Sequence, residues 1–215
     1  DEIRQHYRSS FAAAGSRGGV EVLKALLRLR QTSCHPGLID PTRLGESSAK
    51  LDVLLPLVEE LVDQGHKALI FSQFTGFLGI VRAALDARGL RYSYLDGSTR
   101  KREAEVNAFQ EDPEVPLFLV SLKAGGTGLN LTAADYVFLL DPWWNPAVEA
   151  QAIDRAHRIG REHPVHVYRM IASETIEDRV LELQEKKRDL SSLVLGGAAS
   201  SLSDLDSDDL QFLLS

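Results

Sequence analysis

Residues 67–72 read Lys-Ala-Leu-Ile-Phe-Ser, a short apolar run between polar neighbours. A run of this length without polar alternation predicts a β-strand covered on both faces, as in a parallel sheet. Amphipathic patterns on either side predict helices over 51–63 and 77–88, which Gly65 and Gly89 would end. A buried strand between two helices is the repeating unit of an α/β domain.

The same alternation continues toward the C-terminus, where strand-like and helix-like segments take turns. This pattern predicts a doubly wound α/β domain with a mostly parallel sheet and helices on both faces. Such sheets bind ligands at the carboxyl ends of their strands, so the loops after the strands are the candidate sites. Further strands are expected over 91–95, 116–121, 136–141 and 165–171, and further helices over 101–111, 147–159 and 175–195.

The first part of the chain is predicted to be helical as far as about residue 31. Glycines at Gly15, Gly18 and Gly19 are expected to divide it into two helices. Pro36 stops the pattern because proline has no amide donor. We place the domain boundary in the polar stretch 40–48. The expected organisation is a helical linker segment over 1–48, an α/β lobe over 49–195 and an acidic Leu-rich tail over 196–215.

Amino-acid composition says less about the function than the alternation of strands and helices does. The 215 residues, 44% of them hydrophobic, suffice for one sizeable domain, and no apolar run is long enough to span a bilayer, so no membrane partner is expected. The single cysteine, Cys34, excludes an internal disulfide and a multi-cysteine metal site. The net charge of −7 does not by itself indicate nucleic-acid binding. Because the chain begins with Asp1 and not Met, we expect the natural protein to be longer.

Two of the candidate loops carry residues suited to phosphate chemistry. Gly126 and Gly128 belong to a glycine-rich stretch that could bring backbone amides close to a phosphate, or could simply form a flexible turn. Gln151, Arg155 and Arg158 stand at i, i+4 and i+7 and would line one helical stripe. Two guanidiniums one turn apart suit a phosphate chain that gathers charge. A solvated basic helix face is the alternative.

Five short motifs follow one another along the chain. They are 69–74 (Leu-Ile-Phe-Ser-Gln-Phe), 95–99 (Leu-Asp-Gly-Ser-Thr), the glycine-rich stretch 123–131, 141–146 (Asp-Pro-Trp-Trp-Asn-Pro) and 154–160 (Asp-Arg-Ala-His-Arg-Ile-Gly). Together they resemble the Swi/Snf family of chromatin-remodelling and DNA-translocating ATPases, a branch of the superfamily-two helicases. The resemblance covers about residues 23–190. It departs from the family pattern at Arg161, where glutamine is usual, and at Ala49, where glycine usually precedes the lysine.

The resemblance implies that ATP is held between two RecA-like lobes and that this chain is the second, with a linker before it and a bracing helix after it. The first lobe would supply the phosphate loop and the acidic box that hold ATP and Mg²⁺. Neither is found here, so the isolated chain is expected to be inactive. Arg155 and Arg158 are implied as arginine fingers, Gln151 as a residue that positions the nucleotide or the attacking water, and Gly126 and Gly128 as ATP-binding backbone.

The resemblance also implies that double-stranded DNA lies along one rim of the lobe. Short hydroxyl and amide side chains would grip its backbone without reading sequence. Trp144 is implied as a minor-groove contact, with a core tryptophan as the alternative. The implied backbone contacts are Ser72, Gln73, Thr75, Ser98, Thr99, Arg100, Lys123, Thr127 and Asn130.

The expected partners are duplex DNA, the first RecA-like lobe of the same protein and transcription or repair complexes. The short Leu-rich acidic ending favours a prokaryotic source and a cytoplasmic, nucleoid-associated protein; a eukaryotic source would place it in the nucleus. That ending is expected to be a solvated tail, although Leu210, Phe212, Leu213 and Leu214 could dock on the rest of the chain. Three alternatives remain: a non-catalytic nucleic-acid or protein-binding module with the same fold, an RNA helicase lobe, and a dinucleotide-binding domain, whose Gly-x-Gly-x-x-Gly fingerprint is missing.

Overall fold

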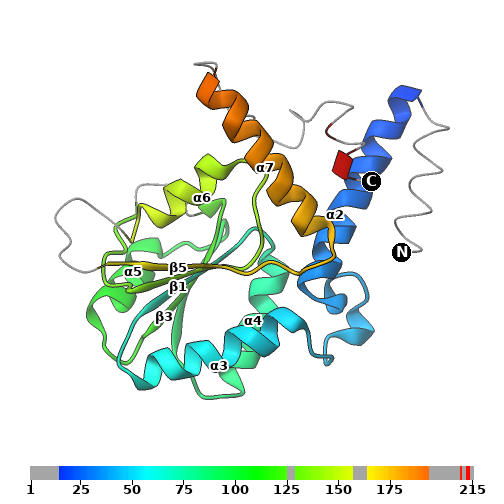
Figure 1. Cartoon of the computed structure of the whole chain (residues 1–215). Helices are drawn as coiled ribbons and strands as arrows, with labels where there is room; N and C mark the ends of the chain where they lie inside the picture. Colours follow the sequence, from blue (N-terminus) through cyan, green and yellow to red (C-terminus); the bar gives the residue numbers. More distant parts are fainter. Residues whose placement is uncertain (1–14, 125–128, 157–163, 194–208, 210–211, 214–215) are drawn as a thin grey trace. The chain divides into compact units, whose positions relative to one another are not determined.

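The computed structural model describes residues 15–124, 129–156, 164–193, 209 and 212–213 (Figure 1). The chain divides into two compact units, which we call the helical unit and the sheet unit. The helical unit comprises Asp1–Glu46, Pro142–Pro146 and Ile171–Ser215, and the sheet unit comprises Ser47–Asp141 and Ala147–Met170. None of the helices in the described part is long and apolar enough to cross a membrane.

The sheet unit is built on a parallel sheet with the strand order β2-β3-β1-β4-β5 in the described part of the chain. The central strands β1 (Ala68–Ser72) and β3 (Leu117–Ser121) are buried along their whole length, as their continuous apolar sequences predict. The other strands are β2 (Tyr92–Leu95), β4 (Tyr136–Leu139) and β5 (His166–Arg169). The predicted doubly wound α/β fold is confirmed.

Helices cover both faces of this sheet. Helices α3 (Ala49–Asp63) and α4 (Thr75–Asp86) contact each other on one side, and α6 (Pro146–Ile153) lies on the other (Figure 1). Helix α5 (Arg102–Glu111) connects β2 to β3, in the direction opposite to the β1–α4–β2 crossover. Because parallel crossovers are right-handed, α5 belongs to the face opposite α4.

Local sequence sets the ends of α3 and α4. The Ser48 hydroxyl accepts a hydrogen bond from the Leu51 amide (3.4 Å) and so caps α3. Gly65 and Gly89 follow the two helices with φ of +78° and +68°. Glycine reaches this left-handed region without steric cost, so both helices end where the sequence predicts.

The helical unit pairs α2 (Gly15–Cys34) with α7 (Ile176–Leu193). Helix α2 continues through Gly18 and Gly19, so the predicted break at these glycines is wrong. Two interior glycines cost about 1 kcal/mol each relative to alanine, and burial of the apolar face of α2 against its own unit offsets that cost. A second expected helix before Gly15 lies outside the described residues.

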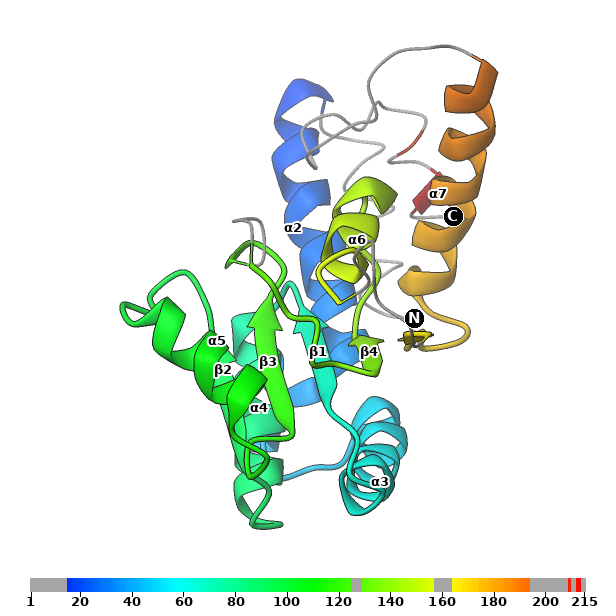
Figure 2. The same ribbon diagram turned by 90° about the vertical axis from the view of Figure 1, so that its left-hand side faces the viewer.

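Residues near the C-terminus pack into the core of the helical unit. In both views the short red segment near the C-terminus lies between α2 and α7 (Figures 1 and 2). Leu213 is fully buried, and the Arg179 guanidinium lies 5.5 Å from the centre of the Phe212 ring. The buried cluster comprises Val22, Leu26, Trp144, Ile176, Val180, Leu183 and Leu213.

Candidate functional site

Two strands of the sheet unit are tied to their neighbours at their carboxyl ends. The Leu122 amide, just after β3, donates to the Ser72 carbonyl at the end of β1 (2.9 Å). The Leu140 amide, just after β4, donates to the Phe71 carbonyl (2.9 Å). The ends of β1, β3 and β4 therefore meet at one edge, where parallel sheets bind their ligands.

The loop after β1 holds three of the predicted DNA contacts in different environments. Ser72 is fully buried, and its hydroxyl donates to Asp141 and accepts from the Phe74 amide (3.0 Å). The half-buried Gln73 donates to Asp141 from its side-chain amide (2.6 Å) and its backbone amide (3.2 Å). Thr75 is exposed at the start of α4. Only Gln73 and Thr75 are thus accessible to a ligand.

The loop after β2 is organised around Asp96, which the sequence analysis did not single out. One carboxylate oxygen accepts from the amide and hydroxyl of Ser98 (2.8 and 2.7 Å) and from the Thr99 hydroxyl (3.2 Å). The other accepts from the Tyr94 hydroxyl (3.0 Å). These bonds, with the Ser98 hydroxyl first, lower the pKa of Asp96 to about 2, and burial raises the pKa of Tyr94 to about 12. Ser98 and Arg100 are left exposed on the rim of a rigid turn.

The glycine-rich stretch is described only at its ends. Lys123 and Asn130 are exposed, whereas Gly126, Thr127 and Gly128 lie outside the described residues. At the far end of the stretch, the Leu131 amide donates to the Arg155 carbonyl (3.1 Å). The stretch is therefore anchored to β1 by Leu122 and to the arginine segment by Leu131.

The arginine segment differs from the helix predicted over 147–159. Helix α6 ends at Ile153, and the amides of Arg155 and Ala156 bond three residues back, to Ala152 (3.4 Å) and Ile153 (3.0 Å). This tighter turn changes the direction of the side chains that follow. Gln151 is exposed while Arg155 is only 6% exposed, so the two do not share the predicted stripe. Arg158 lies outside the described residues.

A buried carboxylate on α6, also missed by sequence reasoning, fixes this helix to the sheet. Glu149 is fully buried and pairs with Nε of Arg169 on β5 (3.0 Å). Nothing in the local sequence signals this pair, because the residues are twenty positions apart and on different elements.

Trp144 belongs to the helical unit, where it is 7% exposed within the buried cluster. The Arg30 guanidinium lies 4.5 Å from the centre of its ring and donates to the Pro142 carbonyl. This placement matches the core alternative that the sequence left open.

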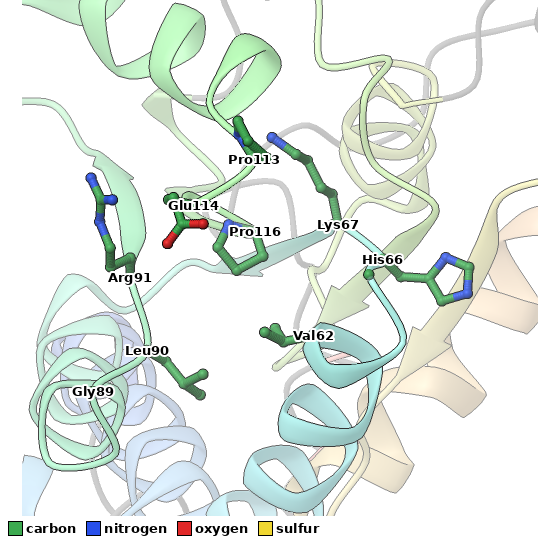
Figure 3. A pocket seen from close by; sticks show the side chains of 10 residues that line it. Val62, His66, Lys67, Gly89, Leu90, Arg91, Pro113, Glu114 and Pro116 are labelled. Atoms are coloured by element: carbon green, nitrogen blue, oxygen red, sulfur yellow. The ribbon is translucent and has the colours of Figure 1, made fainter.

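A pocket of about 400 Å³ lies at the opposite, amino edge of the sheet (Figure 3). Its wall includes Lys67, whose ammonium donates to the carbonyls of Phe109 and Asp112 (2.5 and 2.7 Å) and whose pKa is lowered by burial. None of the predicted site residues lines this pocket. The candidate site therefore remains the carboxyl edge. The pocket is lined by Val62, Gly65, His66, Lys67, Gly89, Leu90, Arg91, Pro113, Glu114 and Pro116.

A parallel α/β sheet with an arginine turn and a glycine-rich stretch at its carboxyl edge defines the class of RecA-like motor lobes. The chain belongs to the helicase conserved C-terminal domain family, whose model matches residues 49–160, and within it to the Swi2/Snf2 type. It is similar to the Sulfolobus solfataricus SWI2/SNF2 ATPase C-terminal domain (28% identity, TM-score 0.75, 99% of this chain and 89% of that one).

Two further comparisons extend this result. The SWI2/SNF2 ATPase core of Sulfolobus solfataricus in complex with dsDNA matches 99% of this chain and 47% of its own length (28% identity, TM-score 0.74). The DNA repair protein rad8 of Schizosaccharomyces pombe is 47% identical over 144 residues, which are 65% of this chain and 13% of rad8. The chain thus spans a small part of that relative. Curated eukaryotic relatives such as rad8 give no support to a prokaryotic source or to a cytoplasmic location.

Proposed function

We propose that the chain is the second motor lobe of an ATP-dependent translocase or remodeller of double-stranded DNA. A first lobe of the same protein would hold ATP and Mg²⁺, and this lobe would complete the site and grip the DNA backbone. The observation that supports this most directly is the anchoring of the glycine-rich stretch, by Leu122 to Ser72 and by Leu131 to Arg155. Those bonds join the proposed DNA-facing loop to the proposed ATP-facing turn.

The ATP-facing part of the proposal rests on Arg155 and Arg158. Packing and the hydrogen bond from the Leu131 amide restrict the Arg155 segment, so little conformational freedom would be lost when its turn binds a phosphate. Arginine stays protonated and offers a fixed fork of donors to the γ-phosphate. The exposed Gln151, on the last turn of α6, would position the nucleotide or the attacking water. The glycine backbone at Gly126 and Gly128 would approach the nucleotide.

The DNA-facing part rests on exposed polar side chains of the same sheet edge. They combine hydroxyl and amide groups with few cations, a composition suited to backbone contacts that carry no sequence information. The Ser72 hydroxyl already bonds Asp141 and the Phe74 amide, and Trp144 packs in the buried cluster with the Arg30 guanidinium against its ring, so we assign them no direct DNA contact. The proposed contacts are Gln73, Thr75, Ser98, Thr99, Arg100, Lys123, Thr127 and Asn130.

The test is the steady-state ATPase activity of the full-length protein, with and without duplex DNA. Replacing Arg158 by alanine is expected to lower the DNA-stimulated kcat by about 10³-fold or more, because arginine fingers contribute about 10³–10⁵ in related hydrolases. Arg43→Ala is the matched control, since Arg43 forms an exposed pair with Glu46 in the helical unit and should change kcat less than twofold.

Three results would contradict the motor assignment or the arginine-finger role. DNA binding without hydrolysis in the wild type would favour the non-catalytic module, and stimulation by duplex RNA in place of DNA would favour an RNA helicase. An Arg158→Ala variant as active as Arg43→Ala would remove the finger role. The isolated lobe, which lacks the phosphate loop and acidic box, is proposed to hydrolyse no ATP. Repair or transcription complexes are proposed partners, with a nuclear location if the source is eukaryotic.

A further inference from the structure

Asp141 is a buried carboxylate two residues after β4, described above only as the hydrogen-bond acceptor for Ser72 and Gln73. It is 1% exposed, and both of its oxygens accept hydrogen bonds from the loop after β1. One oxygen accepts from the Ser72 hydroxyl, and the other accepts from the backbone and side-chain amides of Gln73. A buried carboxylate is costly unless donors surround it, so this loop is held in one position.

Ser72 extends the contact beyond Asp141. Its carbonyl accepts from the amide of Leu122 (2.9 Å), the residue that precedes the glycine-rich stretch. At the other end of that stretch, the Leu131 amide donates to the carbonyl of Arg155 (3.1 Å). Asp141, Ser72, the two ends of the stretch and the arginine turn are thus linked through successive hydrogen bonds and the covalent chain.

The position of Asp141 is itself fixed from the other side. Lys50 is 3% exposed on α3, and its ammonium donates to the carbonyl of Leu140, the residue before Asp141. The Leu140 amide bonds to Phe71 in β1. The backbone next to Asp141 is therefore held in place by hydrogen bonds from α3 and to β1, as a positioning residue requires.

We infer that Asp141 is a positioning residue that couples the DNA-facing loop to the arginine turn through Ser72. This inference rests on the proposed function. Gln73 is half-buried, and its bonds to Asp141 set the orientation in which its side chain would meet the DNA backbone. A displacement of this loop on DNA would be passed by Ser72 to Leu122 and so to the glycine-rich stretch. Asp141 itself touches neither DNA nor ATP.

The test uses Asp141→Asn, Ser72→Ala and the double variant in the full-length protein. Asparagine keeps the shape of the side chain but replaces one carboxylate oxygen by an NH₂ group. In the wild type, one oxygen accepts from Ser72 and the other from Gln73, so the variant leaves one of these two sets of donors facing another donor. Each single variant is expected to lower the ratio of DNA-stimulated to basal kcat by about tenfold, within the range reported for residues along coupling networks. The double variant is expected to lose no more than either single variant, because both break the same link. The Kd for duplex DNA should change less than twofold.

The matched control is Glu177→Gln, the same chemical change at another fully buried carboxylate. Glu177 accepts from the Ala172 amide (2.9 Å) in the helical unit and takes part in none of the hydrogen bonds described for Asp141. It should leave the ratio of stimulated to basal kcat unchanged. If Asp141→Asn does not fold, as shown by its melting temperature, Ser72→Ala carries the test alone.

Three outcomes would overturn the inference. A Kd for DNA that rises as much as the stimulation falls would show that Asp141 acts only through the grip of the loop on DNA, without coupling to the arginine turn. Losses that multiply in the double variant would show two independent roles, and variants that match the wild type would show no role. A wild type without DNA stimulation would overturn the proposed function as well, so the two failures are told apart by the wild type alone.

Discussion

Replacing Leu213 by alanine tests whether the end of the chain is part of the folded helical unit. Leu213 is fully buried among six other side chains of the buried cluster. Full burial of a leucine side chain contributes about 1.5–3 kcal/mol, and leucine-to-alanine changes in cores cost about 2–5 kcal/mol with the cavity included. Because this cluster is small and can partly collapse, we expect the free energy of unfolding to fall by about 2 kcal/mol.

The assay follows tryptophan emission during denaturant and thermal unfolding. Both tryptophans, Trp143 and Trp144, lie in the helical unit, so their emission reports on that unit. A loss of about 2 kcal/mol corresponds to a melting temperature lower by about 4–8 °C for a chain of this size. Leu44→Ala is the control, because Leu44 is 50% exposed in the same unit and its truncation should cost less than about 0.5 kcal/mol. Equal stability of the two variants would refute docking of this segment.

Two further predictions concern the sheet unit. The depressed pKa of Asp96 means that its hydrogen bonds stabilise the fold above its usual pKa of 3.8 and that this contribution is lost as pH falls toward 2. Asp96→Asn should therefore be less stable than wild type at pH 5, by under about 1 kcal/mol because the turn is accessible to solvent. At pH 2 the two proteins should be equally stable. A difference in the free energy of unfolding that persists in urea titrations at pH 2 would contradict the assignment. Lys67→Met should leave the carbonyls of Phe109 and Asp112 without their donor and cost about 1–2 kcal/mol, seen as faster amide hydrogen exchange at the end of α5; unchanged exchange there would speak against it.

The tail illustrates how far composition can mislead. Its aspartates and serines are typical of a solvated segment, yet Leu213 is fully buried and the Phe212 ring lies against Arg179. The sequence raised docking as an option without naming a surface. The surface is formed by α2 and α7, which are more than a hundred residues apart, and local periodicity carries no information about such a pairing.

At the carboxyl edge of the sheet, some features were predicted from the sequence and others were visible only in the structure. The order of motifs correctly identified the family, and Gly65 and Gly89 correctly predicted where α3 and α4 end. The helical stripe of Gln151 and Arg155 was not found, because the chain tightens after Ile153 and buries the arginine. Asp96, Asp141 and Glu149 were missed, since a carboxylate gains its role from donors on other strands and loops.

Sequence alone determined the alternation of buried strands and amphipathic helices, and with it a parallel α/β lobe of the Swi2/Snf2 type. These features depend on side chains a few residues apart, so they can be read along the chain. Only the tertiary structure decided which polar groups are enclosed and which face solvent. It bonded the Ser72 hydroxyl to Asp141, 69 residues further on, and packed the Trp144 ring against the Arg30 guanidinium. Burial and hydrogen bonding are properties of neighbours in space, and the fold chooses those neighbours.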